Sequence, residues 1–278
     1  ANAYTQKTNK ANRTTMGAQM TVSSIAYNRH LSILDRLSEN ERVRVDELAQ
    51  ELKVSTVTVR RDLDYLNEHG FLIRTHGGAT RLHPRQVMQQ ESRFVEKGGV
   101  NVAEKERIGV RAASAVSEND IIFLNSGSTA MTFLRALRDI HVRVITNSAA
   151  AIDHQIDPLV ELLVLGGEYR EQSRSFVGEF ALNTLRNIYS NHTVLGTNGF
   201  SLDHGLTTTV FQECTINQAM IENTHGNVIV LADHSKIGHV SNFVSAPAEA
   251  VDVLVTDSGC PDDFIAAAQE RGIEVIIV

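Results

Sequence analysis

A turn rich in glycine and hydroxyl groups, Ser126-Gly127-Ser128-Thr129, is the part of the sequence best suited to binding an anion. It opens a segment, residues 130–138, that is expected to form a helix. Exposed backbone N–H groups at a helix N-terminus, with hydroxyls beside them, form phosphate sites. The alternative is that the turn is an ordinary helix cap. The turn lacks the Gly-Lys-Ser/Thr of a nucleotide triphosphatase, so that class of enzyme is not predicted.

Polar residues stand at the ends of apolar segments that are expected to form strands. The seven predicted strands are 121–124, 142–145, 159–165, 193–195, 228–231, 251–255 and 274–278. They alternate with helix-like segments, which predicts an α/β domain around a mostly parallel sheet. The first six strands each run into small polar residues. Because the carboxyl ends of parallel strands share one edge of a sheet, we expect these residues to line one ligand pocket.

The candidate pocket residues are the turn itself and the polar or charged side chains that follow the strands. They are Asn125, Ser126, Gly127, Ser128, Thr129, Asn147, Gly167, Arg170, Asn198, Glu213, Asp233 and Lys236. Lys236 and Arg170 suit a phosphorylated ligand, although Arg170 is equally typical of a surface ion pair. The three asparagines and Asp233 are candidates for hydrogen bonds to sugar hydroxyls. Glu213 is either an acid in the pocket or a favourable charge at a helix N-terminus.

Residues 43–83 have the pattern of a helix, a turn, a second helix and a β-wing. Ser55 is expected to cap the second helix, because its hydroxyl can accept a hydrogen bond from a backbone N–H in the first turn. The buried face of this helix is predicted to contain Val59, Leu63 and Leu66. Its opposite face carries hydroxyls and guanidiniums, which suit a helix lying in a major groove. The alternative is a small helical module for protein interaction.

The wing is predicted from a strand over 71–73, a turn at Gly77-Gly78 and the basic residues around that turn. Gly70 is expected to end the preceding helix, and residues 24–38 supply the third helix of the unit. The candidate DNA-contacting residues are Ser55, Thr56, Thr58, Arg60, Arg61, Arg74, His76 and Arg81.

Charge divides the chain into a basic head and an acidic body. Residues 1–85 hold 13 Lys and Arg against 9 Asp and Glu, whereas residues 86–278 hold 13 against 24. The net charges are therefore +4 and −11, so the head is the end expected to bind a polyanion. Because +4 is a modest charge, we expect a dimer or a larger homo-oligomer to be needed for tight DNA binding.

The composition is that of an ordinary soluble protein of two domains, with 42% hydrophobic and 21% charged residues. The sequence predicts no membrane segment, and its two distant cysteines predict neither a disulfide nor a zinc site, in keeping with a cytoplasmic location. No metal or cofactor is expected. The predicted organisation is a disordered tail (1–23), a winged helix-turn-helix (24–82), a linker (83–103) and an α/β sensor domain (104–278).

The head resembles the winged helix-turn-helix of DeoR/GlpR-type bacterial transcription regulators. The resemblance rests on a Ser-capped helix with Thr58-Val59-Arg60-Arg61-Asp62-Leu63 and on a later Arg74-Thr75-His76-Gly77-Gly78-Ala79. The body is similar to the sensor domain of the same family through Gly166-Gly167, Gly196-Thr197-Asn198-Gly199 and Leu231-Ala232-Asp233-His234-Ser235-Lys236. The match covers about residues 24–278.

This resemblance implies a repressor of a carbohydrate-utilisation operon that binds double-stranded operator DNA as a dimer or tetramer. It implies a sensor fold like that of ribose-5-phosphate isomerase and a phosphorylated sugar as effector, which usually relieves repression. The sequence departs from the family pattern at Asn125 and Asn198, where Asp is frequent, and at Asn217, where Lys is frequent.

The rival hypothesis is an active sugar-phosphate isomerase with a DNA-binding head. Moving a proton between adjacent carbons needs a titratable base, and an amide cannot titrate. Asn125 and Asn198 therefore favour binding without turnover, although Glu213 and Asp233 remain candidate bases. An RNA-binding adaptor is a third hypothesis, but the head offers few aromatic residues for stacking on bases.

Overall fold

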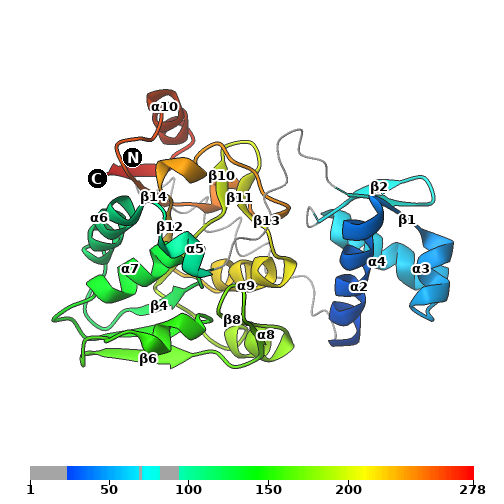
Figure 1. The fold of residues 1–278 in the computed structure, drawn as a ribbon, viewed down its shortest axis with the longest axis horizontal. Coiled ribbons are helices and arrows are strands. Elements are labelled where there is room, and N and C mark those ends of the chain that lie inside the picture. The colour runs from blue at the N-terminus through cyan, green and yellow to red at the C-terminus, as the bar shows by residue number, and fades with distance from the viewer. Residues whose placement is uncertain (1–23, 69–70, 82–93) are drawn as a thin grey trace. The chain divides into compact units, whose positions relative to one another are not determined.

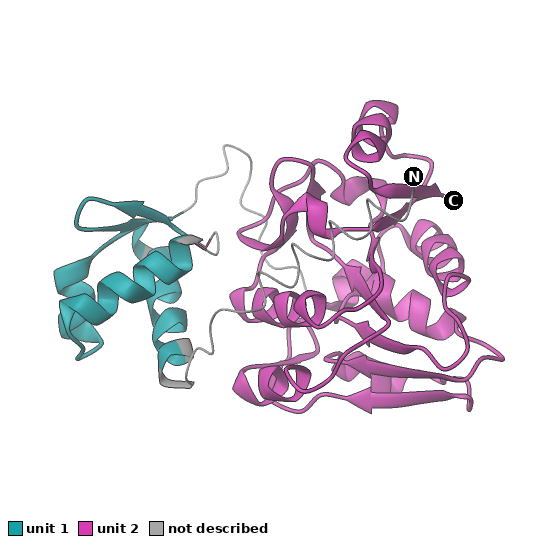
Figure 2. Ribbon diagram, turned by 180° about the vertical axis from the view of Figure 1, so that it is seen from behind, with its two compact units in different colours: residues 1–68, 72–81 teal, residues 69–71, 82–278 magenta. Residues whose placement is uncertain are grey.

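The computed structural model describes residues 24–68, 71–81 and 94–278. Two compact units make up the chain, residues 1–68 with 72–81 and residues 69–71 with 82–278 (Figure 2). The predicted tail (1–23) and the predicted helix-ending Gly70 lie outside the described residues. Within the described part of the chain, no helix combines the length and apolar character needed to cross a membrane.

The described residues of the first unit form three helices and a small antiparallel sheet (Figure 1). The helices are α2 (Ser24–Asn40), α3 (Val45–Glu51) and α4 (Thr56–Glu68), and the strands are β1 (Arg42–Arg44), β2 (Ile73–Thr75) and β3 (Gly78–Thr80). The strand order is β1-β3-β2. This arrangement confirms the predicted winged helix-turn-helix, with β2 two residues later than expected.

Helix α4 forms where the sequence predicts the second helix of the pair. The Ser55 hydroxyl accepts a hydrogen bond from the backbone N–H of Thr58 (3.1 Å), so the predicted cap is confirmed. The predicted apolar face is fully buried at Val59, Leu63 and Leu66. The amphipathic pattern therefore fixes which face of α4 remains available to a partner.

The wing contains one strand that the sequence pattern did not reveal. Strand β1 pairs with β3, placing Arg44 opposite Gly78. A Cβ atom on Gly78 would lie 2.0 Å from the backbone oxygen of Val43, so only glycine fits where the two strands meet. The β1 strand has three residues, which is too short to show an alternating pattern.

The second unit is built around a seven-stranded parallel sheet of order β15-β14-β12-β9-β4-β5-β6. Its strands are β4 (Ile121–Leu124), β5 (Val142–Thr146), β6 (Val160–Val164), β9 (His192–Gly196), β12 (Val228–Leu231), β14 (Val253–Thr256) and β15 (Glu274–Ile277). All seven predicted strands lie in this sheet, which confirms the predicted α/β class.

Helices cover the sheet and connect its strands. They are α6 (Val102–Ala113), α7 (Ser128–Ala136), α8 (Glu179–Leu185), α9 (Phe211–Glu222) and α10 (Asp262–Glu270), with short 3-10 turns η1 (Ala149–Asp153), η2 (His234–Lys236) and η3 (Ala248–Ala250). Ile108 of α6 and Phe133 of α7 pack in one core cluster with Ile122 and Leu124 of β4. Phe123 is fully buried outside that cluster, as alternation along a strand with two covered faces requires.

Two small antiparallel sheets and one short helix accompany the main sheet. The small sheets are β7 (Glu168–Arg170) with β8 (Ser175–Val177), and β10 (Gly199–Ser201) with β11 (Gly205–Thr208) and β13 (Phe243–Ala246). The short helix α5 (Phe94–Gly98) lies in the segment 83–103 that was predicted to be a linker. The later part of that segment is thus folded structure of the second unit.

Candidate functional site

A pocket of the second unit lies at the carboxyl ends of β4, β9 and β12, which are neighbours in the sheet. From β4 the chain continues to β5 and β6 on one side, and it later returns to β9 on the other side. Strands β4 and β9 therefore flank the point where the strand order reverses, which is the usual ligand crevice of an open α/β sheet. The cavity measures about 200 Å³, which suits a small polar metabolite.

Eight of the twelve predicted residues line this pocket. They are Asn125, Ser126, Gly127, Ser128, Thr129, Asn198, Glu213 and Lys236. They come from the exits of the three central strands and from α9, whereas the exits of β5, β6 and β14 do not reach the pocket. The prediction of one pocket shared by six strand exits therefore holds for three of them, those of β4, β9 and β12, and is wrong for the other three.

The predicted anion-binding turn opens helix α7, with Gly127 as its N-cap residue. Gly127 has no side chain that could accept a hydrogen bond from the first turn of this helix. The N–H groups of that turn stand at the wall of the pocket, where they can donate to an anion. A Cβ atom on Gly127 would lie 3.5 Å from the Cα atom of Gly196, so the exits of β4 and β9 approach each other closely here.

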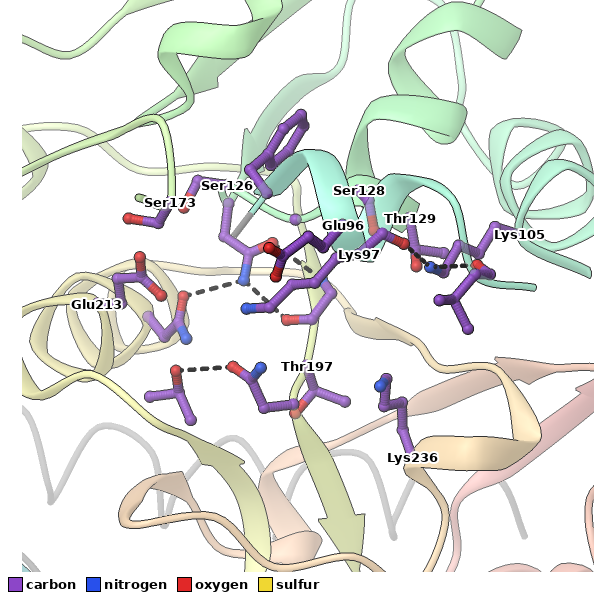
Figure 3. Close-up of a pocket in the computed structure, with 18 residues that line it drawn as sticks. Glu96, Lys97, Lys105, Ser126, Ser128, Thr129, Ser173, Thr197, Glu213 and Lys236 are labelled. Atoms are coloured by element: carbon purple, nitrogen blue, oxygen red, sulfur yellow. Dashed lines mark hydrogen bonds between the residues drawn. The ribbon is translucent and has the colours of Figure 1, made fainter. Parts of the chain in front are cut away.

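Three lysines from different elements surround the pocket, Lys97 of α5, Lys105 of α6 and Lys236 of η2 (Figure 3). Lys105 is 5% exposed. Burial lowers the pKa of Lys105, Asp233 opposes this effect, and the neighbouring charges of Lys236 and Lys97 lower the pKa further. Such a cluster of positive charge, partly removed from water, favours an anionic ligand.

Asn125 forms part of the pocket wall as a fixed amide. Its Nδ2 donates to the backbone oxygen of Gly196 (2.9 Å) and to Oδ1 of Asn217 (3.1 Å), and its Oδ1 accepts from the N–H of Gly196 (2.9 Å). Asn217 in turn donates to the Ser245 hydroxyl (3.3 Å). Two of the three residues at which the sequence departs from the family pattern, Asn125 and Asn217, are therefore direct partners, and the pair carries no charge.

Glu213 and Asn198 provide polar groups on other parts of the wall. Glu213 is 9% exposed and accepts a hydrogen bond from the Ser175 hydroxyl (3.3 Å). Asn198 accepts from the hydroxyl of Thr208 (3.1 Å). Carboxylate and amide oxygens of this kind can accept hydrogen bonds from the hydroxyl groups of a sugar.

Asn147 and Asp233 were predicted to line the pocket, but the structure places both outside it. Asn147 is 1% exposed, and its amide donates to the backbone oxygen of Phe176 (3.1 Å). Asp233 is also 1% exposed and accepts hydrogen bonds from Asn101 Nδ2 (2.8 Å) and from Ser235. Both residues are therefore parts of the framework behind the wall.

Gly167 and Arg170 also lie outside the pocket. Gly167 has a φ of 139°, and a Cβ atom there would lie 2.4 Å from the backbone oxygen of Val177. Its role is the turn into the β7–β8 hairpin. Arg170 lines a separate hollow with Tyr169 and Arg174.

Ten further residues line the pocket without having been predicted to do so. They are Phe94, Glu96, Lys97, Val100, Lys105, Ser173, Gly196, Thr197, Thr208 and Asn217. Gly196 ends β9 and Thr197 follows it directly, so the strand-exit argument could have included them. The residues of α5 carry no such signal, because the segment lacks an apolar pattern and lies far from the strands in sequence.

The first unit presents the predicted DNA-contacting face on α4 and the wing. Arg60, Arg61 and His76 are exposed, and Thr56 and Arg81 are half-buried. Val57 lies between the two threonines and is 54% exposed, which adds an apolar group to this face. Exposed guanidiniums on a capped helix can contact both base edges and phosphates.

Three of the predicted contact residues already have structural partners. The hydroxyls of Ser55 and Thr58 are hydrogen-bonded to each other (2.9 Å). Arg74 pairs with Asp64 of α4 (2.7 Å) and donates to the backbone oxygen of Gly78 (2.6 Å). Arg74 thus joins the wing to α4, a role that the sequence pattern did not predict.

Comparison with known proteins places both units in one family. The model of the DeoR-like helix-turn-helix domain matches residues 29–85, and that of the DeoR C-terminal sensor domain matches residues 100–258. The chain belongs to the DeoR family. As a DeoR-family protein it is a DNA-binding transcription regulator.

The chain is similar to several DeoR-family proteins along most of its length. It is 33% identical to the transcriptional repressor AccR of Agrobacterium fabrum (86% of the chain, 92% of AccR). It is 30% identical to the repressor GlcR of Bacillus subtilis (90% and 95%) and 32% identical to the regulator YulB of the same species (90% and 96%).

Among solved structures, ribose 5-phosphate isomerase A of Methanocaldococcus jannaschii is similar over 49% of this chain and 55% of that enzyme. The sequence identity is 19% and the TM-score is 0.36.

Proposed function

We propose that this DeoR-family protein represses a carbohydrate-utilisation operon and is controlled by a phosphorylated sugar bound in the pocket. The observation that carries the proposal is the meeting of the first turn of α7 with the ammonium groups of Lys105 and Lys236 at one cavity. Backbone N–H donors and lysines together are the usual partners of a phosphate group. The similarity to the repressors AccR and GlcR supports repression as the direction of control.

The remainder of the pocket suits the sugar part of such a ligand. Asn198, Thr197 and Glu213 offer hydrogen-bonding groups, and Phe94 and Val100 offer apolar surface. Sugars combine hydroxyl groups with apolar C–H faces, so a wall of both kinds can orient them. The phosphate would lie at α7, and the hydroxyls would lie toward Glu213 and the end of β9.

We infer that the pocket binds its ligand without converting it. Of the two predicted bases, Asp233 lies outside the cavity and is held by Asn101 and Ser235. Asn125 has hydrogen bonds at both ends of its amide and cannot titrate. The isomerase hypothesis needs a carboxylate in the cavity to act as the base. Asp233 lies outside the cavity, and Asn125 and Asn198 are amides, so Glu213 is the candidate base that remains.

DNA binding would use α4 of two heads in a dimer. Each α4 would enter a major groove, with half-sites about 34–36 Å apart along the DNA. Ligand binding would favour an arrangement in which the heads no longer match this spacing. A coupling of about 1–3 kcal/mol changes DNA affinity roughly 5–150-fold, which is enough for induction.

Calorimetric titration with pairs of phosphorylated and unphosphorylated sugars tests the ligand class. We expect one phosphorylated sugar to bind and its unphosphorylated form to leave no heat signal. Binding of the unphosphorylated form alone would contradict the phosphate site. A coupled isomerase assay tests turnover, and activity that disappears in Glu213→Gln would overturn the inference of binding without conversion.

A further inference from the structure

Residues 94–101, called the strap below, run along the pocket immediately before α6. Phe94, Glu96, Lys97 and Val100 of the strap line the cavity, and Figure 3 shows Glu96 and Lys97 on the ribbon of α5. The strap is the first described part of the second unit after the DNA-binding unit along the chain. Along the chain, the strap therefore lies between the DNA-binding unit and α6.

The strap is anchored at both ends. At its start the backbone N–H of Phe94 donates to the backbone oxygen of Gln172 (2.9 Å). At its end Nδ2 of Asn101 donates to Oδ1 of Asp233 (2.8 Å), with the Asn101 backbone in the left-handed region at a φ of 50°. These bonds fix the ends of the strap, and a further attachment holds its middle.

Lys105 supplies that middle attachment. Its Nζ donates to the backbone oxygens of Lys97 (2.5 Å) and Val100 (2.7 Å), at and just beyond the end of α5. The backbone oxygen of Lys105 also accepts a hydrogen bond from the Thr132 hydroxyl of α7 (2.8 Å). Lys105 thus contacts both the strap and the helix that opens at the proposed anion site.

An ammonium group has three N–H donors, and the strap carbonyls occupy two of those on Lys105. Lys105 lines the pocket, so its third donor can serve a group bound there. We propose that Lys105 is a positioning residue through which an anion bound at the start of α7 orders the strap. The anion accepts the third N–H, fixes the ammonium, and so strengthens its hold on the carbonyls of Lys97 and Val100.

Electrostatics favours the same coupling. The charges of Lys97 and Lys236 act on the buried Lys105 and, together with burial, lower its pKa despite the opposing effect of Asp233. An anion among these lysines offsets their repulsion and stabilises the charged form of Lys105. The inference rests on the proposed function only in requiring an anion at this site.

Hydrogen–deuterium exchange of the full chain, with and without inorganic phosphate, tests the inference. In the wild type we expect phosphate to slow exchange several-fold in two segments, 128–134 and 94–101. In Lys105→Met we expect phosphate to slow 128–134 but to leave 94–101 unchanged. Lys236→Met is the matched control, because it removes the same charge without touching a strap carbonyl. Lys236→Met should require a higher phosphate concentration for the effect, but phosphate should still slow exchange in both segments together.

The outcomes separate the inference from the proposed function. If phosphate slows 128–134 but not 94–101 in the wild type, the inference is overturned and the anion site stands. If phosphate slows neither segment, the anion site fails and the inference fails with it. If Lys105→Met speeds exchange in the core strands as well, Asn101→Ala decides. In Asn101→Ala without phosphate, the strap should exchange faster than in the wild type, and phosphate should slow its exchange again. If phosphate does not slow exchange of the strap in this variant, the inference is overturned.

Discussion

Asp62 joins helix α4 to helix α2 through a cluster of charges inside the first unit. It is 5% exposed, receives two hydrogen bonds from Arg29 (2.5 and 2.8 Å) and lies 3.0 Å from Nε2 of His30. Burial raises the pKa of Asp62, but the bonds from Arg29 and His30 outweigh that effect and leave the pKa lowered. Asp62 thereby holds α4 against α2, while Arg60 and Arg61 of α4 remain exposed.

Asp62→Asn should destabilise the first unit by about 1.5–3 kcal/mol, the usual range for a hydrogen bond to a charged group. Because the folded pKa is lowered, this stabilisation is present above the unfolded pKa near 4 and is lost as the pH falls through the folded value. In urea unfolding of the full chain, the free energy of unfolding should therefore be lower for the variant than for the wild type at neutral pH. This difference in free energy should become smaller in acid. A gap that widens in acid would contradict the assignment.

Arg61→Ala should weaken specific DNA binding by about 1–3 kcal/mol if its guanidinium contacts a base edge. Arg61 and its neighbour Arg60 are exposed on α4, so their removal should leave the fold unchanged. Arg107→Ala, which removes an arginine from α6 in the second unit, is the control. If the Arg60→Ala, Arg61→Ala double variant binds the operator with wild-type affinity, α4 is not the helix that reads the groove.

Lys236→Met should weaken binding of the sugar phosphate by about 1.5–3 kcal/mol, because a charge-assisted hydrogen bond is lost. Operator binding without ligand should stay at the wild-type level, since Lys236 lies in the second unit. Calorimetry for the ligand and fluorescence anisotropy for DNA measure the two effects separately. Loss of both activities together would indicate misfolding instead of a ligand contact.

At the scale of elements, the wing depends on close pairing of β1 with β3. Gly78→Ala should weaken this pairing by about 1–3 kcal/mol, as overpacking of tightly packed sites does, because the new methyl group would meet the backbone of Val43. Gly166→Ala is the control, since a Cβ atom there meets nothing within 4 Å. Gly78→Ala should lower the thermal unfolding temperature and weaken operator binding, whereas Gly166→Ala should leave both unchanged. Equal behaviour of the two variants would contradict the account of the wing.

The sequence was sufficient to predict the elements that have a strong hydrophobic pattern or a clear helix cap. Helix α4 has an apolar face and Ser55, and the seven strands of the parallel sheet are apolar runs that end in polar residues. The strand exits also located the central part of the pocket, at Asn125 to Thr129, Asn198 and Lys236. Local pattern is informative wherever burial imposes it on successive residues.

Short elements and long-range pairings were beyond the reach of the sequence pattern. Strands β1, β7, β8 and β10 have three residues each, which is too short to show an alternating pattern. Helix α5 has five residues, which is too short to show a helical period. The partners of Arg74, Asp62 and Lys105 depend on the tertiary fold, which brings distant residues together. The placement of Lys105 under the strap, for this reason, could be found only in the structure.

At the scale of the whole molecule, the two units divide the charge and the tasks between them. The segment 1–85, which contains the first unit, carries a net charge of +4, and residues 86–278 carry −11. DNA affinity should therefore come from the first unit and fall steeply with salt, while the acidic second unit limits nonspecific binding. With a net charge this small, affinity sufficient for control would require two or more heads on one operator.

Fluorescence anisotropy on DNA from the region upstream of its own gene, across a salt series and with a panel of sugar phosphates, tests the central claim most directly. The account predicts specific, salt-sensitive binding that one sugar phosphate changes roughly 5–150-fold and that its unphosphorylated form leaves unchanged. Specific binding that no phosphorylated sugar alters would contradict control through the pocket, and the absence of specific binding would contradict the account as a whole.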